Sequence, residues 1–417
     1  MDFIRIINLW LSILFLLAYG YQFFFIAVAF FKRKPRPVQE RKGDRYAFLI
    51  AARNEEAVIG HLVASAKAQD YPAELLDIYV AADNCTDATA AVAREAGAIV
   101  FERQSDTVGK GYVMDFMLKE IEALHGKQYY EGYFVIDADN VLDPHFVSAM
   151  HRTHCEGYEI ITCYRNTKNF GDNWISSGYG LWFLREARYL NYARYALNTS
   201  CAVSGTGYMF TQRILDECGG WHYYMLTEDI EFTVDNVVRD KKIGYCADAV
   251  VYDEQPVKFS QSWSQRMRWV KGNIQVFAKY GWKLLWRSLT FRGFANYDMM
   301  VTSTAAAIFA LLSVVINAIS FVAYLIMGMP ALFVLTEFGK LMLFSYGVMF
   351  LVGIFTTATE WKQIHCSTWR KILTLFTFPL FMLTYIPIAI VPLFTRVKWK
   401  PIKHTRGKDL EEITKKR

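Results

Sequence analysis

Apolar residues concentrate in two parts of the chain, and the segment between them has the mixed pattern of a globular domain. Residues 8–31 carry no charged side chain, and most positions of residues 298–397 are apolar. An apolar helix of about 20 residues is long enough to cross a bilayer. The pattern therefore predicts an N-terminal membrane anchor within residues 1–31. In the C-terminal membrane region it predicts three further spans, at about residues 299–327, 337–357 and 372–396.

The charges beside the first apolar run predict its orientation. The sequence KRKPRPVQERKGDR follows the run at once, whereas Arg5 is the only cation before it. Basic flanks favour the cytoplasmic side of a membrane. We therefore expect a multi-pass protein of the cell (plasma) membrane, with its N-terminus outside and its globular segment in the cytosol.

The basic tail, residues 398–417, conflicts with three C-terminal spans. Starting from the cytosol, three crossings would leave this tail outside. Either the tail departs from the positive-inside tendency, or the segment interrupted by Pro379, Pro387 and Pro392 folds back without crossing. The sequence leaves both possibilities open.

Between residues 46 and 255, short apolar runs alternate with stretches of helical periodicity. The runs are residues 46–52, 76–83, 98–103 and 132–139. This alternation indicates βαβ units and a mostly parallel sheet, so the predicted fold class of this segment is α/β. Ligands of such sheets bind beyond the carboxyl ends of the strands, where this chain carries polar residues.

Asp137 and Asp139 end the fourth run and are the strongest local signal. Carboxylates suit Mg²⁺ or Mn²⁺, which commonly share their coordination with substrate phosphates. In the alternative, Asp139 and Asn140 form an Asx turn that begins the next helix. Lys110 lies between two glycines and is placed either to contact a diphosphate or to be a solvated lysine.

The stretch MLTEDIEF, residues 225–232, offers a candidate base. A carboxylate held at a helix start can accept a proton from an attacking hydroxyl, and Asp229 is the candidate for that role. In the alternative, Thr227 caps the helix, and Glu228 and Asp229 only stabilise its first turn.

Residues 256–297 predict amphipathic helices at the membrane surface. On a helical wheel, Gln265, Arg268 and Trp269 lie on one side and face the globular domain. An arginine can bind a pyrophosphate bidentately, and an indole offers a flat surface to a pyranose. A plain interfacial helix is the alternative. The opposite side is apolar and is expected to contact the bilayer or the membrane helices; it comprises Trp263, Met267, Val270, Ile274 and Phe277.

Composition narrows the classes of function. The formal net charge of the chain is +6. In a chain with membrane segments, the location of the charges matters more than their sum. No nucleic-acid partner is expected. Seven scattered cysteines without a C-x-x-C pair indicate neither a disulfide framework nor a zinc ribbon. They suit a reducing compartment. The P-loop and nucleophile-elbow patterns are both absent from the sequence.

In this order, the polar segments resemble the membrane-embedded, processive family 2 glycosyltransferases. This group contains hyaluronan synthases, cellulose and chitin synthases, and the nodulation chitooligosaccharide synthases. The resemblance implies a GT-A (Rossmann-like) cytosolic domain at residues 46–255, joined to an α-helical transmembrane bundle. The segments that carry it are AARNEE (51–56), AADNCTD (81–87), GKG (109–111), DAD (137–139), SGTGYM (204–209), TED (227–229) and QRMRW (265–269).

The resemblance also implies roles for individual residues and an inverting transfer from a UDP-sugar, with Mg²⁺ or Mn²⁺ as the cofactor. Asp229 is the implied catalytic base, and Asp137 and Asp139 are the implied metal ligands. The implied donor site comprises Ala52, Asn54, Glu55, Glu56, Asp83, Lys110, Asp137, Gln265 and Arg268. The implied acceptor site comprises Trp269, Gly205, Thr206, Gly207 and Glu228.

The leading hypothesis from the sequence is a processive enzyme that builds and exports a β-linked polysaccharide. Its partners would be the UDP-sugar donor, the growing polysaccharide and membrane lipids. The first alternative is the transfer of a single sugar to a lipid acceptor, for which Trp269 would matter less. The second alternative is a non-catalytic membrane scaffold or transport component. The sequence predicts neither the donor sugar nor the oligomeric state.

Overall fold

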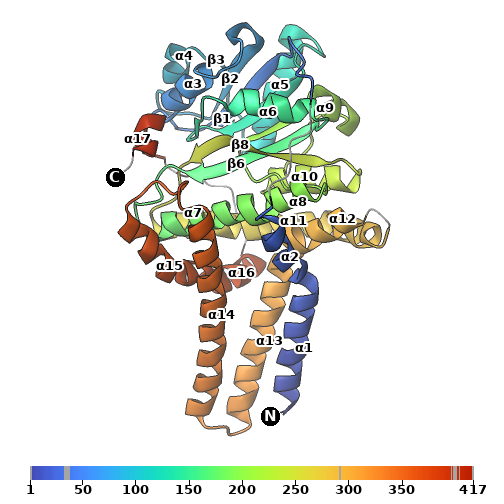
Figure 1. Ribbon diagram of the computed structural model, residues 1–417, viewed down its shortest axis with the longest axis vertical. Helices are drawn as coiled ribbons and strands as arrows, with labels where there is room; N and C mark the ends of the chain where they lie inside the picture. Colours follow the sequence, from blue (N-terminus) through green and yellow to red (C-terminus); the bar gives the residue numbers. More distant parts are fainter. Residues whose placement is uncertain are drawn as a thin grey trace.

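The computed structural model describes residues 2–31, 38–290, 293–395, 397, 402 and 404–415. Its centre is an eight-stranded mixed sheet with helices on both faces (Figure 1). The α/β fold class is therefore confirmed. The strands are β1 (Tyr46–Ala52), β2 (Leu76–Asp83), β3 (Ile99–Arg103), β4 (Gly132–Asp137), β5 (Val141–Leu142), β6 (Ile160–Thr167), β7 (Tyr208–Thr211) and β8 (Ile243–Asp253). Their order across the sheet is β3-β2-β1-β4-β7-β6-β8-β5.

The four predicted runs form the parallel half of the sheet. β1 pairs in parallel with both β2 and β4, and β2 pairs in parallel with β3. The alternation of strands and helices does not predict the other half of the sheet. There, β7 runs antiparallel to both β4 and β6. The fourth run also ends earlier than expected: the strand stops at Asp137, and the Asn140 N–H donates to the Asp137 carbonyl in a turn.

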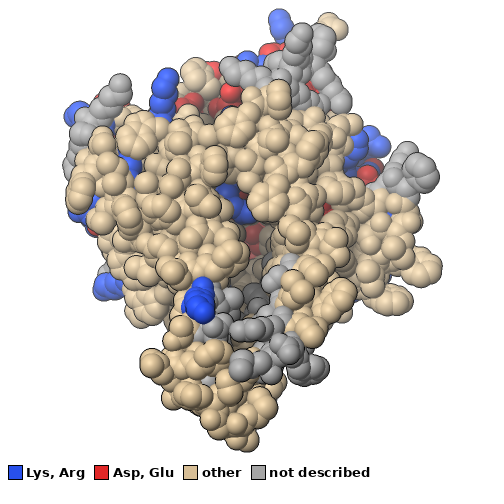
Figure 2. Space-filling view, turned by 60° about the horizontal axis from the view of Figure 1, so that its bottom comes forward, with Lys and Arg blue, Asp and Glu red and all other residues tan. Residues whose placement is uncertain are grey.

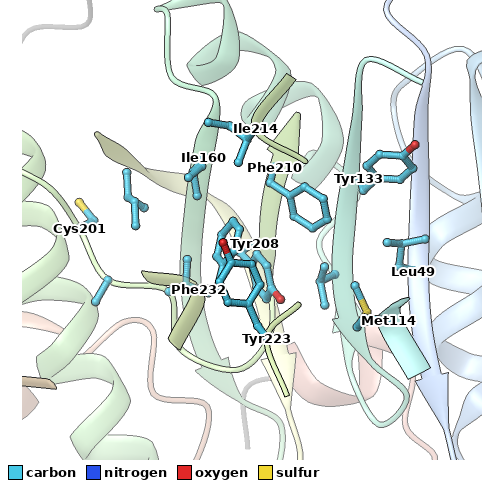
Figure 3. Packing of buried hydrophobic residues seen from close by; sticks show 14 of the residues in the cluster. Leu49, Met114, Tyr133, Ile160, Cys201, Tyr208, Phe210, Ile214, Tyr223 and Phe232 are labelled. Atoms are coloured by element: carbon cyan, nitrogen blue, oxygen red, sulfur yellow. The ribbon is translucent and has the colours of Figure 1, made fainter. Parts of the chain in front are cut away.

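The sheet is buried on both faces by two layers of helices. β1 illustrates the alternation, because Tyr46, Phe48 and Ile50 pack on one face while Ala47 and Leu49 pack on the other. Figure 3 shows the second of these faces, where Leu49, Met114, Tyr208, Phe210 and Phe232 converge. The helices of this domain are α3 (Ile59–Lys67), η1 (Ala73–Leu75), α4 (Thr89–Glu95), α5 (Lys110–His125), α6 (Phe146–Cys155), α7 (Trp174–Arg185), η2 (Glu186–Asn191), α8 (Tyr192–Ala196), α9 (Gln212–Cys218) and α10 (Glu228–Val238).

Apart from α17, the remaining helices lie on one side of this domain (Figure 1). Three of them, α1, α13 and α14, extend away from the sheet as parallel rods (Figure 1). α11, α12, α15 and α16 lie between these rods and the sheet. The bounds are α1 (Asp2–Tyr19), α2 (Tyr21–Val28), α11 (Phe259–Ser288), α12 (Phe294–Met299), η3 (Met300–Ala305), α13 (Ala306–Ile326), α14 (Ala331–Thr359), α15 (Thr368–Leu383), α16 (Tyr385–Phe394) and α17 (Leu410–Thr414).

Two stretches of the described residues are long and apolar enough to cross a membrane, judged by length and composition: Ala331–Thr359 and Thr368–Phe394. The second stretch is broken at Thr384 into α15 and α16. The residues that follow it return to the sheet, where Ile413 of α17 packs on Val141 and Tyr252. Whether the proline-interrupted segment crosses a membrane or folds back stays a prediction from the sequence.

On the apolar side of α11, Val270 is buried and lines a cavity that residues of α14, α15 and α16 also line. The sequence predicted contact of this side with either the bilayer or these helices. Arg266, which the wheel left unassigned, is fully buried where α15 gives way to α16. Its guanidinium donates to Thr384 Oγ1 at 2.6 Å and lies 4.5 Å from the Phe381 ring centroid. The Arg266 guanidinium therefore stabilises the break at Thr384 between α15 and α16, which the prolines of this segment introduce.

A buried ion pair joins α8 to α12, and a residue of α2 contacts the same carboxylate. Arg194 of α8 donates to both carboxylate oxygens of Asp298 in α12, at 2.7 and 2.9 Å, and both side chains are almost fully buried. The Tyr21 hydroxyl of α2 donates to the same carboxylate at 2.6 Å. Losing one partner of such a pair leaves an uncompensated charge in a poorly solvated place.

We predict that Asp298→Asn lowers the free energy of unfolding by about 3–5 kcal/mol, because the buried Arg194 guanidinium loses its counter-ion. Thermal and denaturant unfolding of the purified full-length protein in detergent measures the change. The control is Glu102→Gln, which removes the exposed ion pair with Arg94 and should cost less than about 1 kcal/mol. Equal effects of the two substitutions would contradict the structural importance of the buried pair.

Candidate active site

A cavity of about 720 Å³ begins at the carboxyl ends of the parallel strands and reaches the helices α14–α16. Ala52, Asp83 and Asp137, at the ends of β1, β2 and β4, line its sheet end. Ser345, Met349 and Ala389 line the other end. Figure 2 shows the face that carries the extended helices: it is largely uncharged, and blue and red atoms are visible at the bottom of a central hollow. The cavity therefore joins a charged site to apolar helices.

Asp137 and Lys110 form the ionic contact at the centre of this site. Lys110, the first residue of α5, donates to Asp137 Oδ1 at 2.5 Å and to the Gly205 carbonyl at 2.7 Å. Burial alone would lower the pKa of Lys110, but the Asp137 carboxylate outweighs it and raises that pKa. The ammonium group is therefore charged, and it lies between Asp137 and the loop that contains Gly205.

Asp139 lies one turn beyond the strand and is 4% exposed. Its Oδ2 accepts the Glu254 N–H at 3.0 Å, and its carbonyl accepts from Lys168 Nζ. Burial raises the pKa of Asp139 well above its ordinary value. A divalent cation beside this carboxylate would stabilise its ionised form, so the buried Asp139 and the partly exposed Asp137 fit Mg²⁺ or Mn²⁺.

A polar network that was missing from the sequence predictions supports these aspartates. Arg165 of β6 donates through Nε to Asp253 at 2.8 Å, and Asn140 Nδ2 donates to the other oxygen of Asp253 at 3.1 Å. Although burial alone would raise the pKa of Asp253, the Arg165 guanidinium holds it below the ordinary value. Thr206 completes the network: its hydroxyl donates to Asn140 Oδ1 and accepts the Asp137 N–H.

Glu228 and Asp229 begin α10 and both line the cavity. Asp229 Oδ2 accepts the Gly205 N–H at 2.6 Å, and Gly205 has a φ of +75°, which favours glycine. Burial raises the pKa of Asp229. Burial, followed by the charge of Asp229, raises the pKa of Glu228 to about 7. Burial and mutual repulsion thus disfavour the charged forms of both carboxyl groups.

Gln265, Arg268 and Trp269 of α11 line the same cavity, as their shared side of the helix predicted. Trp269 packs edge-on against Tyr179 and Phe183, with ring centroids 5.7 and 6.2 Å away. Gln265 Oε1 and Arg268 Nε are buried and have no hydrogen-bond partner among the residues that the structure describes. Buried polar atoms normally have partners, so these two mark positions where a bound molecule would supply them.

The structure brings most of the proposed site residues into one cavity. Those in its lining are Ala52, Glu55, Asp83, Lys110, Asp137, Asp139, Gly205, Glu228, Asp229, Gln265, Arg268 and Trp269. Four others lie outside that lining. Asn54 and Glu56 accept the N–H groups of Thr86 and Ala88, so they tie two loops together. The Thr206 hydroxyl accepts the backbone N–H of Asp137, and Gly207 packs closely against Cys163.

The C-terminal tail supplies part of the cavity wall. His404 Nδ1 lies 2.9 Å from Glu55 Oε1, and His404 Nε2 lies 3.9 Å from Asp139 Oδ2. Burial opposes the charge on His404, but Asp139 and Glu55 raise its pKa to about 10. At that pKa the ring is protonated, so it would join the aspartates as a third candidate metal ligand only if a divalent cation displaced its proton. No local sequence pattern could reveal it, because its partners are distant in the chain.

Comparison with protein families identifies the segment that contains this site. The model described as "Glycosyltransferase like family 2" matches residues 44–272. The Beta-monoglucosyldiacylglycerol synthase of Synechocystis sp. is 25% identical over 256 residues, which are 56% of this chain and 51% of that protein. The probable glycosyltransferase YdaM of Bacillus subtilis is 22% identical over 259 residues, 57% of each chain. The chain thus spans about half the length of the curated relatives it matches.

A shorter match and a solved structure complete the comparison. The 4,4'-diaponeurosporenoate glycosyltransferase of Staphylococcus aureus is 48% identical over 64 residues, 15% of this chain and 16% of that protein. The mannosyltransferase PcManGT from Pyrobaculum calidifontis, solved with GDP-Man and Mn²⁺, superposes with a TM-score of 0.60 at 16% identity. The superposition covers 93% of this chain and 98% of that chain, and it supports the expected GT-A fold.

We predict that Asp139→Asn weakens Mn²⁺ binding more than about 100-fold and that His404→Gln weakens it about 10-fold. Electron paramagnetic resonance of free Mn²⁺, titrated with the full-length protein and a nucleoside diphosphate, measures both. The control, Glu122→Gln, removes an exposed carboxylate of α5 and should change nothing. Unchanged Mn²⁺ affinity in Asp139→Asn would place the metal elsewhere.

Proposed function

The chain belongs to the glycosyltransferase-like family 2, and on this basis we propose that it transfers a single sugar from a nucleotide-sugar donor to the hydroxyl group of a membrane lipid. The observation that carries the proposal is the continuous cavity between the carboxylates at the sheet end and α14–α16. A donor with a charged diphosphate fits the sheet end, whereas an apolar acceptor fits the helix end. The diacylglycerol in the name of the cyanobacterial relatives supports this acceptor class.

The donor is proposed to be a UDP-sugar bound between the β1 and β2 ends and α5. Asp83 and Glu55 lie where the uridine would bind, and Lys110 and Arg268 supply positive charge to the diphosphate. Asp137, Asp139 and His404 would hold Mg²⁺ or Mn²⁺. When bound, this cation neutralises the negative charge that develops on the departing nucleotide.

Asp229 is the proposed base of an inverting displacement. It would take the proton of the acceptor hydroxyl, while the diphosphate leaves on the side of Lys110 and Asp137. The Gly205 backbone contacts both Asp229 and Lys110: its N–H donates to Asp229, and its carbonyl accepts from Lys110. The proposed base and the proposed leaving group are therefore held next to each other. A single displacement turns an α-linked donor into a β-glycoside.

Processive synthesis of a polysaccharide is the second candidate. It is favoured by the Gln265, Arg268 and Trp269 side chains in the cavity wall, which match the resemblance drawn from the sequence. The relatives named for lipid products favour single transfer instead. The proposal therefore adopts what was the alternative at the level of the sequence. A non-catalytic scaffold is disfavoured by the complete set of acidic residues in the cavity.

For location, we propose a protein of the cell membrane whose sugar-transferring domain lies in the cytosol. α1, α13 and α14 extend together from one side of the molecule and would cross the bilayer (Figure 1). α15 and α16 would lie at its cytosolic surface, which would keep the basic tail on the same side as the active site. Two apolar stretches of spanning length support membrane association.

We predict that the purified protein, given a UDP-sugar and dioleoylglycerol in mixed micelles, forms a lipid with one added sugar. Mass spectrometry of the product measures the number of sugars. A ladder of longer products that collapses to one sugar in Trp269→Ala would favour the processive candidate instead.

Asp229→Asn should lower kcat about 10²–10⁴-fold, because the hydroxyl loses its proton acceptor. Its Mn²⁺ and nucleotide binding should stay unchanged, since Asp229 does not contact either proposed group. Wild-type rates of UDP release in this variant would contradict the role of Asp229.

The rate should also fall as the pH falls. Asp229 accepts a proton only when it is ionised, and burial raises its pKa, so kcat/KM decreases as the pH drops through the pKa range of the Glu228–Asp229 pair. Glu228→Gln removes the neighbouring negative charge and should shift this decrease to lower pH. Glu228→Asp keeps the charge and should leave it in place. A profile from about pH 5 to about pH 9 tests both variants.

A further inference from the structure

One wall of the cavity carries more unpartnered polar groups than the donor site explains. Besides Gln265 and Arg268, this wall contains Thr227, at the start of α10, and Asn273 of α11. The Thr227 hydroxyl oxygen and Asn273 Oδ1 are both shielded from solvent, and neither has a hydrogen-bond partner within the part of the chain that the structure describes. Buried polar atoms of this kind are costly unless a bound molecule supplies the missing hydrogen bonds.

Thr227 does not play the capping role considered for it from the sequence. It occupies the N-cap position of α10, but its side chain makes no cap hydrogen bond. The side chain is 5% exposed and packs on Gly272 of α11, where an added Cβ would lie 2.5 Å from the Thr227 hydroxyl oxygen. Asn273 follows Gly272 directly. The two unpartnered groups therefore lie where the start of α10 contacts α11, and Glu228 and Asp229 line the cavity beside them.

The position of Asn273 along α11 separates it from the proposed diphosphate site. A helix rises about 1.5 Å per residue, so Asn273 lies about 7.5 Å beyond Arg268 and about 6 Å beyond Trp269 along the helix axis. Trp269 and Asn273 are four residues apart and project from the same side of the helix. The acceptor, whose hydroxyl group must reach Asp229, is therefore the molecule that comes next to Asn273.

The chemistry of the two atoms limits what can satisfy them. The side-chain oxygen of Asn273 only accepts hydrogen bonds, so its partner must be an O–H or N–H group, whereas the Thr227 hydroxyl can donate. A diphosphate and the esters of a diacylglycerol contain acceptors alone, and the single hydroxyl of a diacylglycerol is the one that Asp229 deprotonates. A second hydroxyl beside the reacting one would donate to Asn273 and accept from Thr227.

We propose that Asn273 and Thr227 form a second acceptor subsite, which binds a hydroxyl group adjacent to the one that receives the sugar. This inference rests on the proposed transfer to a lipid, and it narrows the acceptor to lipids with two neighbouring hydroxyl groups. A diacylglycerol leaves the Asn273 oxygen unpartnered and is therefore the poorer acceptor. Sites that bind a hydroxyl discriminate against the analogue without it, because their own polar groups then lack partners.

The test compares hexadecylglycerol, which has two adjacent hydroxyl groups, with hexadecyloxypropanol, which lacks only the inner one. With a UDP-sugar and the full-length protein in mixed micelles, kcat/KM for hexadecylglycerol should be at least about tenfold higher. Asn273→Leu and Thr227→Val roughly keep the side-chain size and remove the hydrogen bond, so each should lower this ratio about three- to tenfold. Both alcohols use the same base, so any effect of a substitution on Asp229 cancels in the ratio.

Two control variants on α11 separate lost hydrogen bonding from altered packing. Gln275 also has a buried side-chain oxygen without a partner among the described residues, but it does not belong to the cavity lining. Gln275→Leu should therefore keep the wild-type ratio. Asn273→Asp retains an oxygen that accepts a hydrogen bond and should keep the ratio as well. An equal fall of the ratio in Gln275→Leu and Asn273→Leu would overturn the subsite.

The remaining outcomes separate this inference from the proposed function. Equal use of the two alcohols by the wild type, or a wild-type ratio in Asn273→Leu, overturns the subsite while the transfer to lipid stands. The first of these comparisons needs no variant, so the inference stays falsifiable if the substituted proteins do not fold. If dioleoylglycerol and both alcohols stay unmodified while the nucleotide sugar is consumed, the proposed function fails and the inference falls with it.

Discussion

The pairing of buried charges is the constraint on which this structure depends. A site with several acidic side chains lies directly beside helices of low polarity, and an isolated charge in such a place is costly. Lys110 faces Asp137, Arg165 faces Asp253, and Lys168 binds the backbone beside Asp139. Each of these three cations comes from a different element. Their contacts with the acidic residues and the backbone therefore hold α5, β6 and the loop after β6 together at the end of the sheet.

The parallel half of the sheet and its carboxylates were predictable from local sequence. A buried strand that ends in polar residues has a short-range pattern, and this pattern predicts Asp83, Asp137 and Asp139, which line the cavity. Asp229 lines it as well and is predictable because a helix start has its own signature. These residues also lie where the sheet geometry requires ligand-binding groups to lie.

The rest of the site depends on pairings between distant segments, which local patterns do not encode. Arg165 and Asp253 meet only because β6 pairs with β8, and that half of the sheet mixes parallel and antiparallel strands. The helical wheel placed Trp269 correctly but gave Arg266 no role, because its partners Phe381 and Thr384 belong to a later helix pair. In a similar way, the resemblance to processive enzymes rested on short motifs at the sheet end of the cavity and in α11, which do not report which acceptor a protein uses.

The position of His404 has a consequence for the newly made chain. Its imidazole contacts Glu55, which the ribosome translates 349 residues earlier. All eight strands of the sheet and the helices α13–α16 are therefore synthesised before His404 can close this part of the cavity wall. The cavity thus acquires its complete lining only after residue 404 has been made.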